Sequence, residues 1–397
     1  GRVLREITRQ GAAGLEPRLL TAEQRNTTIV YGEDLVLKLY RRTEKGVHSE
    51  VEIVRNLTEK AGFALIPPYV GSLEYRLASG ESIVLGLMQR YVPNQGDAWK
   101  LTQDLLGRFF DRVLTRSDVI NKPPKAPRDP LQAMDMDLPA PLDELVAGQT
   151  LEMARLLGRR TAGLHRALAG CGGEAFHPEP FTKLYQRALF QSMQTATRQV
   201  LRLLSRAVTR LPEEVRTLAE NVLTLEDTIV TRLRRVADDT FQAQKIRIHG
   251  DFHLGHALYT GKDFVICDFE GEPSRPLTER RLKHSPLRDV AGMLSSLRYA
   301  TRAALLLRGD VRQHDVPLLQ PWAEIWGRCV AGRYLGSYLE EMQGSPAIPE
   351  DPDQLENLLF AFLLAKAIKD LENELSHRPA SLIYRLRDIA LLCGEEA

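Results

Sequence analysis

Two aspartates, Asp251 and Asp268, stand 17 positions apart, each in a loop beside a short apolar run. Asp251 lies in the loop 249–256 (HGDFHLGH), and Asp268 opens the loop 268–273 (DFEGEP). Phosphoryl transfer needs one carboxylate that accepts a proton from the attacking hydroxyl and another that holds a divalent cation. We predict that Asp251 takes the first part and Asp268 the second. Taken singly, each would be interpreted as a turn residue, because Asp favours turns.

A lysine in an apolar strand supports this interpretation. Lys38 stands in the run 35–40 (LVLKLY), where an unpaired ammonium would be costly to bury. Kinases place such a lysine on the nucleotide phosphates and fix it with a glutamate from the next helix. Glu50 and Glu52 both qualify, and we favour Glu52. The alternative is that Lys38 occupies an edge strand and extends its ammonium to water.

The remaining phosphate and metal ligands follow from the same chemistry. His256, five positions after Asp251, is a candidate ligand for Mg²⁺ beside Asp268. No GxGxxG or GxxxxGK[ST] motif occurs, so the segment 23–28 would have to cover the phosphates of ATP. That segment offers backbone N–H groups and the side chains of Asn26, Thr27 and Thr28.

The elements that must position these residues begin with strands. The β-rich runs 27–31 and 35–40 flank a turn signal at 32–34 and predict a hairpin. A helix is expected over 49–60 and a strand over 82–87. Short strands at 246–248 and 264–267 would precede the two aspartate loops.

Helical patterns dominate the rest of the chain. Helices are expected over 97–116, 151–168, 183–210 and 212–237, and again for most of the chain after 288. Six prolines make a long helix unfavourable within 117–147, which we interpret as a surface excursion. The predicted fold class is α+β and bilobal, like a protein kinase. A β-rich nucleotide-binding lobe would span 1–92, and a mostly helical lobe 93–397.

Composition further limits the class of protein to which the chain can belong. The 397 residues are 43% hydrophobic with a net charge of +1, which is typical of a globular protein. This charge balance gives no support for nucleic acid or an anionic membrane as partner. The four cysteines form no CxxC pair, and no apolar run is long enough to span a bilayer. We therefore expect a cytoplasmic protein with free thiols.

The loops HGDFHLGH and DFEGEP together resemble those of the maltokinase family, within the aminoglycoside-phosphotransferase-like kinase fold. The similarity also includes the segments 16–42, 92–99, 178–193, 285–294 and 366–379. It is closest to the maltokinase domains that follow a trehalose synthase in fused bacterial proteins. The resemblance implies transfer of the ATP γ-phosphate to the anomeric hydroxyl of maltose. It also implies maltose 1-phosphate as product, a place between trehalose and α-glucan, and a trehalose synthase domain as partner.

The resemblance also assigns residues. Asp251 would be the base, Asp268 would hold the metal, and Lys38 with Glu52 would hold the phosphates. The segment from Met88 to Tyr91 would be the hinge beside adenine. The residues expected on the sugar side are His253, Lys366 and Arg378.

Three departures from the family pattern bear on specificity. His256 stands where the family usually has Gln, and imidazole is a softer ligand than Mg²⁺ prefers. Lys369 and Asn373 stand where the family has two tyrosines that help to bind the sugar. The N-terminal cap of the family is absent and the first residue is Gly, so we expect the chain to begin inside a longer polypeptide. Two alternatives therefore stay open: a kinase for another sugar or amino sugar, and a degenerate kinase domain that scaffolds a partner enzyme.

Overall fold

The structure is a computed structural model that describes residues 16–20, 25–146, 148–306, 309, 311–377 and 382–395. The chain divides into two compact units. The first unit comprises Gly1–His177, Ile246–Lys283 and Ser296–Met342. The second comprises Pro178–Lys245, His284–Ser295 and Gln343–Ala397. The lobe boundary expected after residue 92 stays a prediction.

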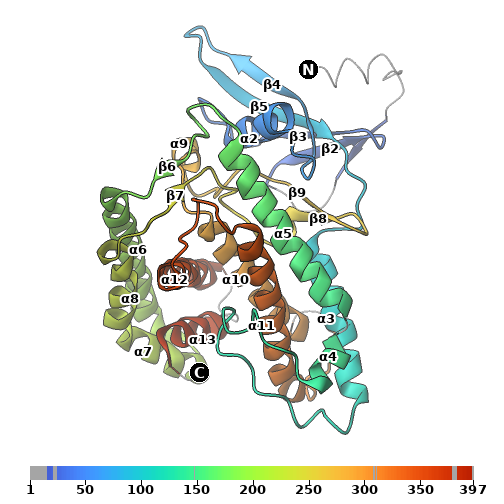
Figure 1. Ribbon diagram of the computed structural model, residues 1–397, viewed down its shortest axis with the longest axis vertical. Coiled ribbons are helices and arrows are strands. Elements are labelled where there is room, and N and C mark those ends of the chain that lie inside the picture. The colour runs from blue at the N-terminus through green and yellow to red at the C-terminus, as the bar shows by residue number, and fades with distance from the viewer. Residues whose placement is uncertain are drawn as a thin grey trace. The chain divides into compact units, whose positions relative to one another are not determined.

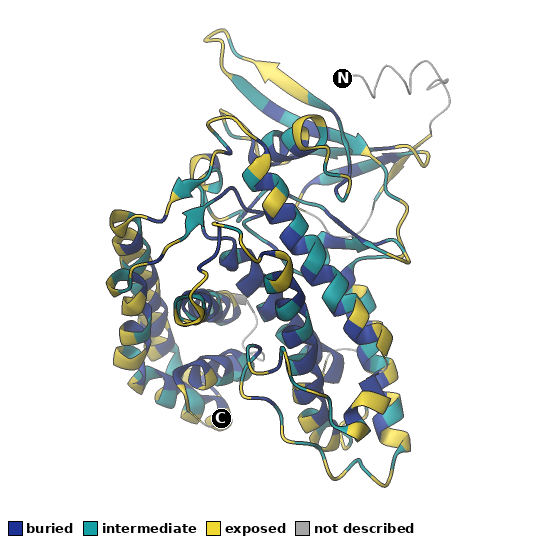
Figure 2. Cartoon of the chain, in the orientation of Figure 1, coloured by how far each residue is buried: buried dark blue, intermediate teal, exposed yellow. Residues whose placement is uncertain are grey.

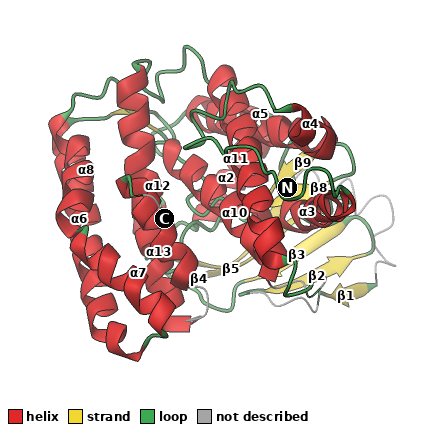
Figure 3. Cartoon of the chain, turned by 90° about the horizontal axis from the view of Figure 1, so that it is seen from below, coloured by secondary structure: helices red, strands yellow, loops and turns green. Residues whose placement is uncertain are grey.

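An antiparallel sheet of five strands, in the order β1-β2-β3-β5-β4, belongs to the first unit (Figures 1 and 3). The strands are β1 (Pro17–Leu19), β2 (Thr27–Tyr31), β3 (Leu35–Leu39), β4 (Tyr69–Arg76) and β5 (Ser82–Arg90). The predicted hairpin is confirmed as β2 and β3, joined through Gly32 with φ 57°. A glycine is suited to that turn because L side chains rarely adopt positive φ. The sequence patterns did not indicate β1 or β4.

The register of the sheet determines which side chains share a face. Lys38 of β3 lies opposite Thr28 of β2 and Leu87 of β5. Residues directly opposite each other in a sheet point to the same face, and the direction alternates along each strand. Thr28, Lys38 and Leu87 therefore share one face, and their immediate neighbours in sequence point to the other.

Helix α2 (Ser49–Asn56) covers the Lys38 face of the sheet, since its Glu50 bonds to Lys38. The helix buries Val51, Ile53 and Val54. The helix predicted over 49–60 is thus confirmed in its α-helical part. Its continuation is a π-helical turn, η1 (Leu57–Ala61), which Gly62 ends with a left-handed φ of 60°.

A second, smaller hairpin carries the aspartate loops. It consists of β8 (Ala257–Tyr259) and β9 (Phe264–Ile266), and a single 3₁₀ turn, η3 (Leu254–His256), precedes it. The strand predicted at 264–267 is confirmed as β9. The one predicted at 246–248 is wrong, because the strand β7 (Gln244–Lys245) ends before it and pairs with β6 (Glu179–Pro180).

Long helices complete the first unit. They are α3 (Ala98–Thr115), α4 (Ala140–Val146), α5 (Gly148–Gly170), the short α9 (Leu277–Arg280) and α11 (Val316–Glu341). Helix α11 is largely buried (Figure 2). It approaches α5 closely at Gly158, where an added Cβ would lie 2.3 Å from the carbonyl oxygen of Tyr334. Within 117–147 the only helix among the described residues is α4, as the prolines predicted.

The second unit is helical apart from β6 and β7. Its helices are α6 (Lys183–Ala207), η2 (Val208–Arg210), α7 (Glu213–Thr224), α8 (Glu226–Asp238), α12 (Pro352–His377) and α13 (Leu382–Cys393). Helix α10 (Leu287–Leu306) starts in this unit and ends in the first. The helix predicted over 212–237 is divided at Leu225 into α7 and α8. Among the described residues, no helix combines the length and the apolarity that a bilayer crossing requires.

Candidate active site

Lys38 lies at the centre of three carboxylates in the first unit. Its Nζ is 3.0 Å from Glu50 Oε2, 2.6 Å from Asp268 Oδ1 and 2.5 Å from Glu270 Oε1. Tyr40 donates a further hydrogen bond of 2.7 Å to Glu50 Oε2. These contacts join the sheet, helix α2 and the loop after β9. The predicted convergence of Lys38 and Asp268 on one place is therefore present.

Mutual charge decides the protonation of this cluster. Burial opposes the ammonium form, but Glu50, Asp268 and Glu270 outweigh it and hold the pKa of Lys38 well above its ordinary value. Burial also opposes ionisation of Asp268, but Lys38 and His256 outweigh it and hold the pKa of that carboxyl well below its usual range. Burial raises the pKa of Glu50. The most exposed of these carboxylates, Asp268, is thus ionised at neutral pH.

Glu50 rather than Glu52 is the partner of Lys38, so the expectation for Glu52 is wrong. Residues two apart on a helix point in nearly opposite directions, and Glu52 turns to Arg247 and Arg281 instead. It accepts a hydrogen bond of 2.7 Å from Nη1 of Arg247 and bonds of 2.9 and 2.7 Å from Nε and Nη2 of Arg281. Burial opposes ionisation of Glu52, but the bonds from the two arginines lower its pKa.

The backbone holds the two aspartate loops against each other. Asp268 has a φ of 67°, a strained conformation for a residue other than glycine and one that clusters at functional sites. Gly250, with φ 85°, precedes Asp251, and a Cβ there would lie 3.4 Å from Cα of Gly271. His249 Nε2 donates a hydrogen bond of 2.9 Å to the carbonyl of Cys267. These features fix Asp251 and Asp268 on neighbouring loops.

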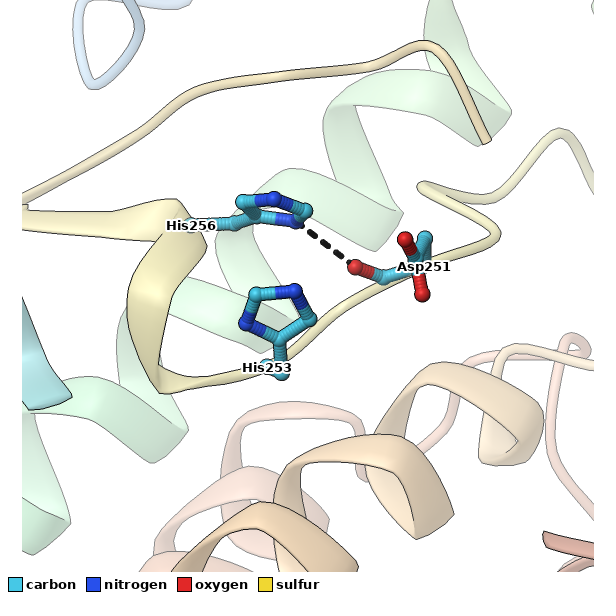
Figure 4. Close-up of side chains that lie close together, drawn as sticks. All are labelled: Asp251, His253 and His256. Carbon is cyan, nitrogen blue, oxygen red and sulfur yellow. Dashed lines mark hydrogen bonds between the residues drawn. The ribbon is translucent and has the colours of Figure 1, made fainter. Parts of the chain in front are cut away.

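Asp251, His253 and His256 gather in the first of these loops (Figure 4). Their potential ligand atoms all lie within 4.8 Å of one another. The rings of His253 and His256 lie with centroids 3.7 Å apart. His256 Nε2 is 3.2 Å from Asp268 Oδ2. Burial opposes a charge on His256, but Asp268 and Asp251 outweigh it and raise the pKa of the ring above its ordinary value.

The residues predicted to cover the phosphates do not all point to the same face of the sheet. Asn26 donates a hydrogen bond of 2.5 Å to Glu270 Oε1, and Thr28 shares the face of Lys38. Thr27 lies opposite Leu39 and therefore points to the other face, where its hydroxyl accepts a bond of 3.1 Å from Arg41 Nε. The expectation for the Thr27 side chain is thus wrong. Of the predicted covering segment, 23 and 24 lie outside the described residues.

The predicted hinge begins inside the sheet. Met88 lies in β5 opposite Leu37, so its side chain points to the face opposite Lys38, where it packs beside Leu35 and Val70. A hinge role for Met88 stays a prediction. Tyr91 is the first residue after β5, and its backbone N–H donates to the carbonyl of Asp34 at 2.8 Å. A hinge role for Tyr91 stays a prediction.

The residues expected on the sugar side lie in different parts of the chain. His253 lies in the loop of Asp251, in the first unit. Lys366 lies on α12 in the second unit, where its Nζ is 2.5 Å from Asp370 Oδ1. Arg378 lies outside the described residues. Sugar binding by these residues stays a prediction.

One member of the cluster, Glu270, was missed. The available signal was a second acidic residue, Glu270, two positions after Asp268 in the same loop. Three carboxylates, Glu50, Asp268 and Glu270, face the single ammonium of Lys38. The excess of negative charge and the oxygen donors fit a divalent cation in this place.

Two curated relatives match most of the chain. One is "Glucosamine kinase" of Mycolicibacterium smegmatis, 25% identical over 296 residues, covering 74% of this chain and 61% of the relative. The other is "Glucosamine kinase" of Streptacidiphilus jiangxiensis, 25% identical over 303 residues, covering 74% of this chain and 57% of the relative. This chain therefore spans about three fifths of the length of these relatives.

Solved structures share the fold. One, described as "Glucosamine kinase in complex with glucosamine, ADP and inorganic phosphate", superposes with a TM-score of 0.68 at 22% identity. The match covers 98% of this chain and 83% of that one. Crystal form B of glucosamine kinase gives a TM-score of 0.66 at 21% identity, with 98% and 82% covered. The predicted α+β fold of the aminoglycoside-phosphotransferase-like kinases is thereby confirmed.

The model of one family matches residues 124–325, which are just over half of the chain. That stretch contains both aspartate loops but neither Lys38 nor Glu50. The maltokinase resemblance is supported at this broader level, while the two curated relatives named above are glucosamine kinases. The chain belongs to the phosphotransferase enzyme family, APH.

Proposed function

We propose that this protein transfers the γ-phosphate of ATP to a hydroxyl of an amino sugar of the glucosamine type. The observation that carries the proposal is the cluster in which Lys38 bridges Glu50 and Asp268 beside the loop of Asp251. A family of phosphotransferases and the names of the relatives support the reaction class. Identity of 25% over part of those relatives leaves the acceptor to be tested.

In this proposal each described residue has one task. When the nucleotide binds, the ammonium of Lys38 gives up part of its contact with the carboxylates and neutralises the phosphates. Glu50 keeps this ammonium directed at the phosphates. Asp251 accepts the proton of the acceptor hydroxyl. At the same time the hydroxyl oxygen of the sugar attacks the γ-phosphorus, and the bond between the γ-phosphorus and the bridging oxygen breaks, so that ADP leaves. Most of the rate would come from positioning and charge stabilisation rather than from covalent catalysis.

The divalent cation would be held by Asp268 and His256, with Glu270 beside them. When bound, such an ion neutralises charge that develops on the transferring phosphates. Asp268 keeps one oxygen on Lys38 at 2.6 Å and turns the other toward His256 at 3.2 Å. One carboxylate therefore serves both the ammonium and the cation.

An amino sugar is favoured over maltose for two reasons. The relatives named above are glucosamine kinases, and two tyrosines of the maltokinase pattern are replaced by Lys369 and Asn373. A tyrosine offers a flat apolar surface for a sugar ring together with a hydroxyl, so the loss of both weakens the case for a disaccharide. Maltose remains the second candidate because of the sequence resemblance. A trehalose synthase partner belongs to that candidate and depends on it.

A panel of acceptors tests the proposal. The protein is incubated with ATP, a divalent cation and one of glucosamine, N-acetylglucosamine, glucose or maltose, and products are identified by mass spectrometry. We expect kcat/KM for glucosamine to exceed that for maltose by on the order of 100-fold. Preference for maltose would overturn the amino-sugar assignment. Nucleotide binding without transfer to any sugar would favour the scaffold alternative.

A further inference from the structure

The ring of His256 is held in one tautomer. Its Nδ1 is 2.8 Å from the carbonyl oxygen of Asp251 (Figure 4). A carbonyl oxygen only accepts hydrogen bonds, so Nδ1 must carry the proton. In the neutral ring the lone pair is then on Nε2, the atom that lies 3.2 Å from Asp268 Oδ2. A nitrogen lone pair and a carboxylate oxygen thus face each other.

Two acceptors at this distance need a positive species between them: a proton on Nε2, which makes the contact an ion pair with Asp268, or a bound cation that replaces that proton. Neighbouring ligands on an octahedral cation with bonds of about 2.1 Å lie about 3.0 Å apart, close to the observed separation. Histidines that bind metals commonly donate their other ring N–H to a backbone carbonyl or carboxylate. The bond from His256 to Asp251 has this form. His256 is therefore oriented as a nitrogen ligand.

His253 is oriented differently, although it lies in the same cluster. Its Nδ1 accepts a hydrogen bond of 3.1 Å from the backbone N–H of Gly255. That bond occupies the lone pair on Nδ1 and leaves the proton of the neutral ring on Nε2. The neighbouring imidazole is thus unsuited to bind a cation in this tautomer, and it provides a matched comparison.

We propose that this site selects a first-row transition cation, with Mn²⁺ or Co²⁺ as representatives, over Mg²⁺. The proposal rests on the proposed function in taking this cation to be the one that accompanies the nucleotide. Mg²⁺ is a hard ion that prefers oxygen ligands and gives up its water reluctantly, whereas imidazole nitrogen favours transition ions. Asp268 supplies the oxygen donor that both kinds of ion accept.

Binding of the metal alone tests this without a sugar or a turnover assay. Dissociation constants for Mn²⁺, from the electron paramagnetic resonance signal of the free ion, and for Mg²⁺, by competition, are compared in wild type and His256→Gln. We expect the preference for Mn²⁺ to fall on the order of 10-fold in the variant. His253→Gln should keep the wild-type preference. An equal preference in wild type and His256→Gln would overturn the proposal.

A second measurement needs no variant and so does not depend on the folding of one. In the Mn²⁺-loaded wild-type protein, electron spin echo modulation should contain the ¹⁴N signal of a coordinated imidazole. Its absence at full loading would overturn the proposal. If the protein transferred phosphate to none of the sugars, the proposed function would be wrong, but the metal-binding result would still stand. The two failures are therefore distinguishable.

Discussion

The ammonium of Lys38 lies 2.6 Å from a carboxylate oxygen of Asp268, although 230 positions separate the two residues in the chain. Lys38 belongs to the five-stranded sheet and Asp268 to the loop after β9. Folding brings together the ammonium to which we assign the nucleotide phosphates and the carboxylate to which we assign the metal.

Replacing Lys38 by Met should reduce nucleotide affinity and kcat together, by on the order of 100-fold or more in kcat/KM. The substitution removes the ammonium that, in the described part of the chain, faces Glu50, Asp268 and Glu270, so the negative charge of this cluster would then repel the phosphates. Steady-state kinetics with ATP as the varied substrate would measure this. Lys45→Met is the control, because Lys45 is exposed and its nearest carboxylate is 3.8 Å away. Similar losses in both variants would contradict the assignment.

Replacing Glu52 by Ala should destabilise the protein by about 3 kcal/mol, because it leaves Arg247 without its partner. Arg247 is only 1% exposed, and its Nη1 is 2.7 Å from Glu52. Urea unfolding of the variant gives this free energy. The matched control is Glu152→Ala, which removes an exposed ion pair with Arg155 and should cost less than about 1 kcal/mol. If the two variants were equally stable, the buried ion pair would contribute no more to the free energy of unfolding than the exposed one.

Acid should destabilise the protein through His48. Burial, and then the charges of Lys38 and Arg280, lower the pKa of His48 from 6.5 to about 3. In the unfolded chain the ring would bind a proton near pH 6.5, so the unfolded state holds more protons between pH 6.5 and 3. Stability therefore falls as the pH drops through this window, by up to about 1.4 kcal/mol per pH unit from this group.

The variant His48→Phe tests this, since Phe can keep the stacking on Tyr40, whose ring centroid is 4.0 Å from that of His48. Its free energy of unfolding should fall less between pH 6.5 and 4.5 than that of wild type. His314→Gln changes an exposed histidine and should follow the wild-type curve. Parallel curves for wild type and His48→Phe would show that His48 does not contribute.

Local patterns were sufficient for much of the fold. Alternating β-rich runs around Gly32 predicted the hairpin of Lys38, and the spacing of Val51, Ile53 and Val54 predicted helix α2. These signals are local, and each depends on neighbours within a few positions. Strands β1 and β4 were missed because their burial patterns are largely exposed or irregular. The break at Leu225 between α7 and α8 has neither a glycine nor a proline to mark it.

Residue types and flanking patterns predicted which chemical groups meet at the site, but not the direction in which each side chain points. Lys38 and Asp268 were identified from residue type and flanking pattern, and they do meet. The choice between Glu50 and Glu52 depended on how α2 is rotated over the sheet, which the apolar spacing did not fix. Thr27 failed for a similar reason, because strand register decides the face of each side chain.

In the proposed function, Asp251 is the base of a sugar kinase. Its most direct test is the transfer of ³²P from [γ-³²P]ATP to glucosamine, measured in single turnovers with wild type and Asp251→Asn at matched nucleotide occupancy. We predict labelled glucosamine phosphate from wild type and a rate lower by on the order of 1,000-fold in the variant, with ATP affinity retained. Equal transfer rates in the two proteins would contradict the account.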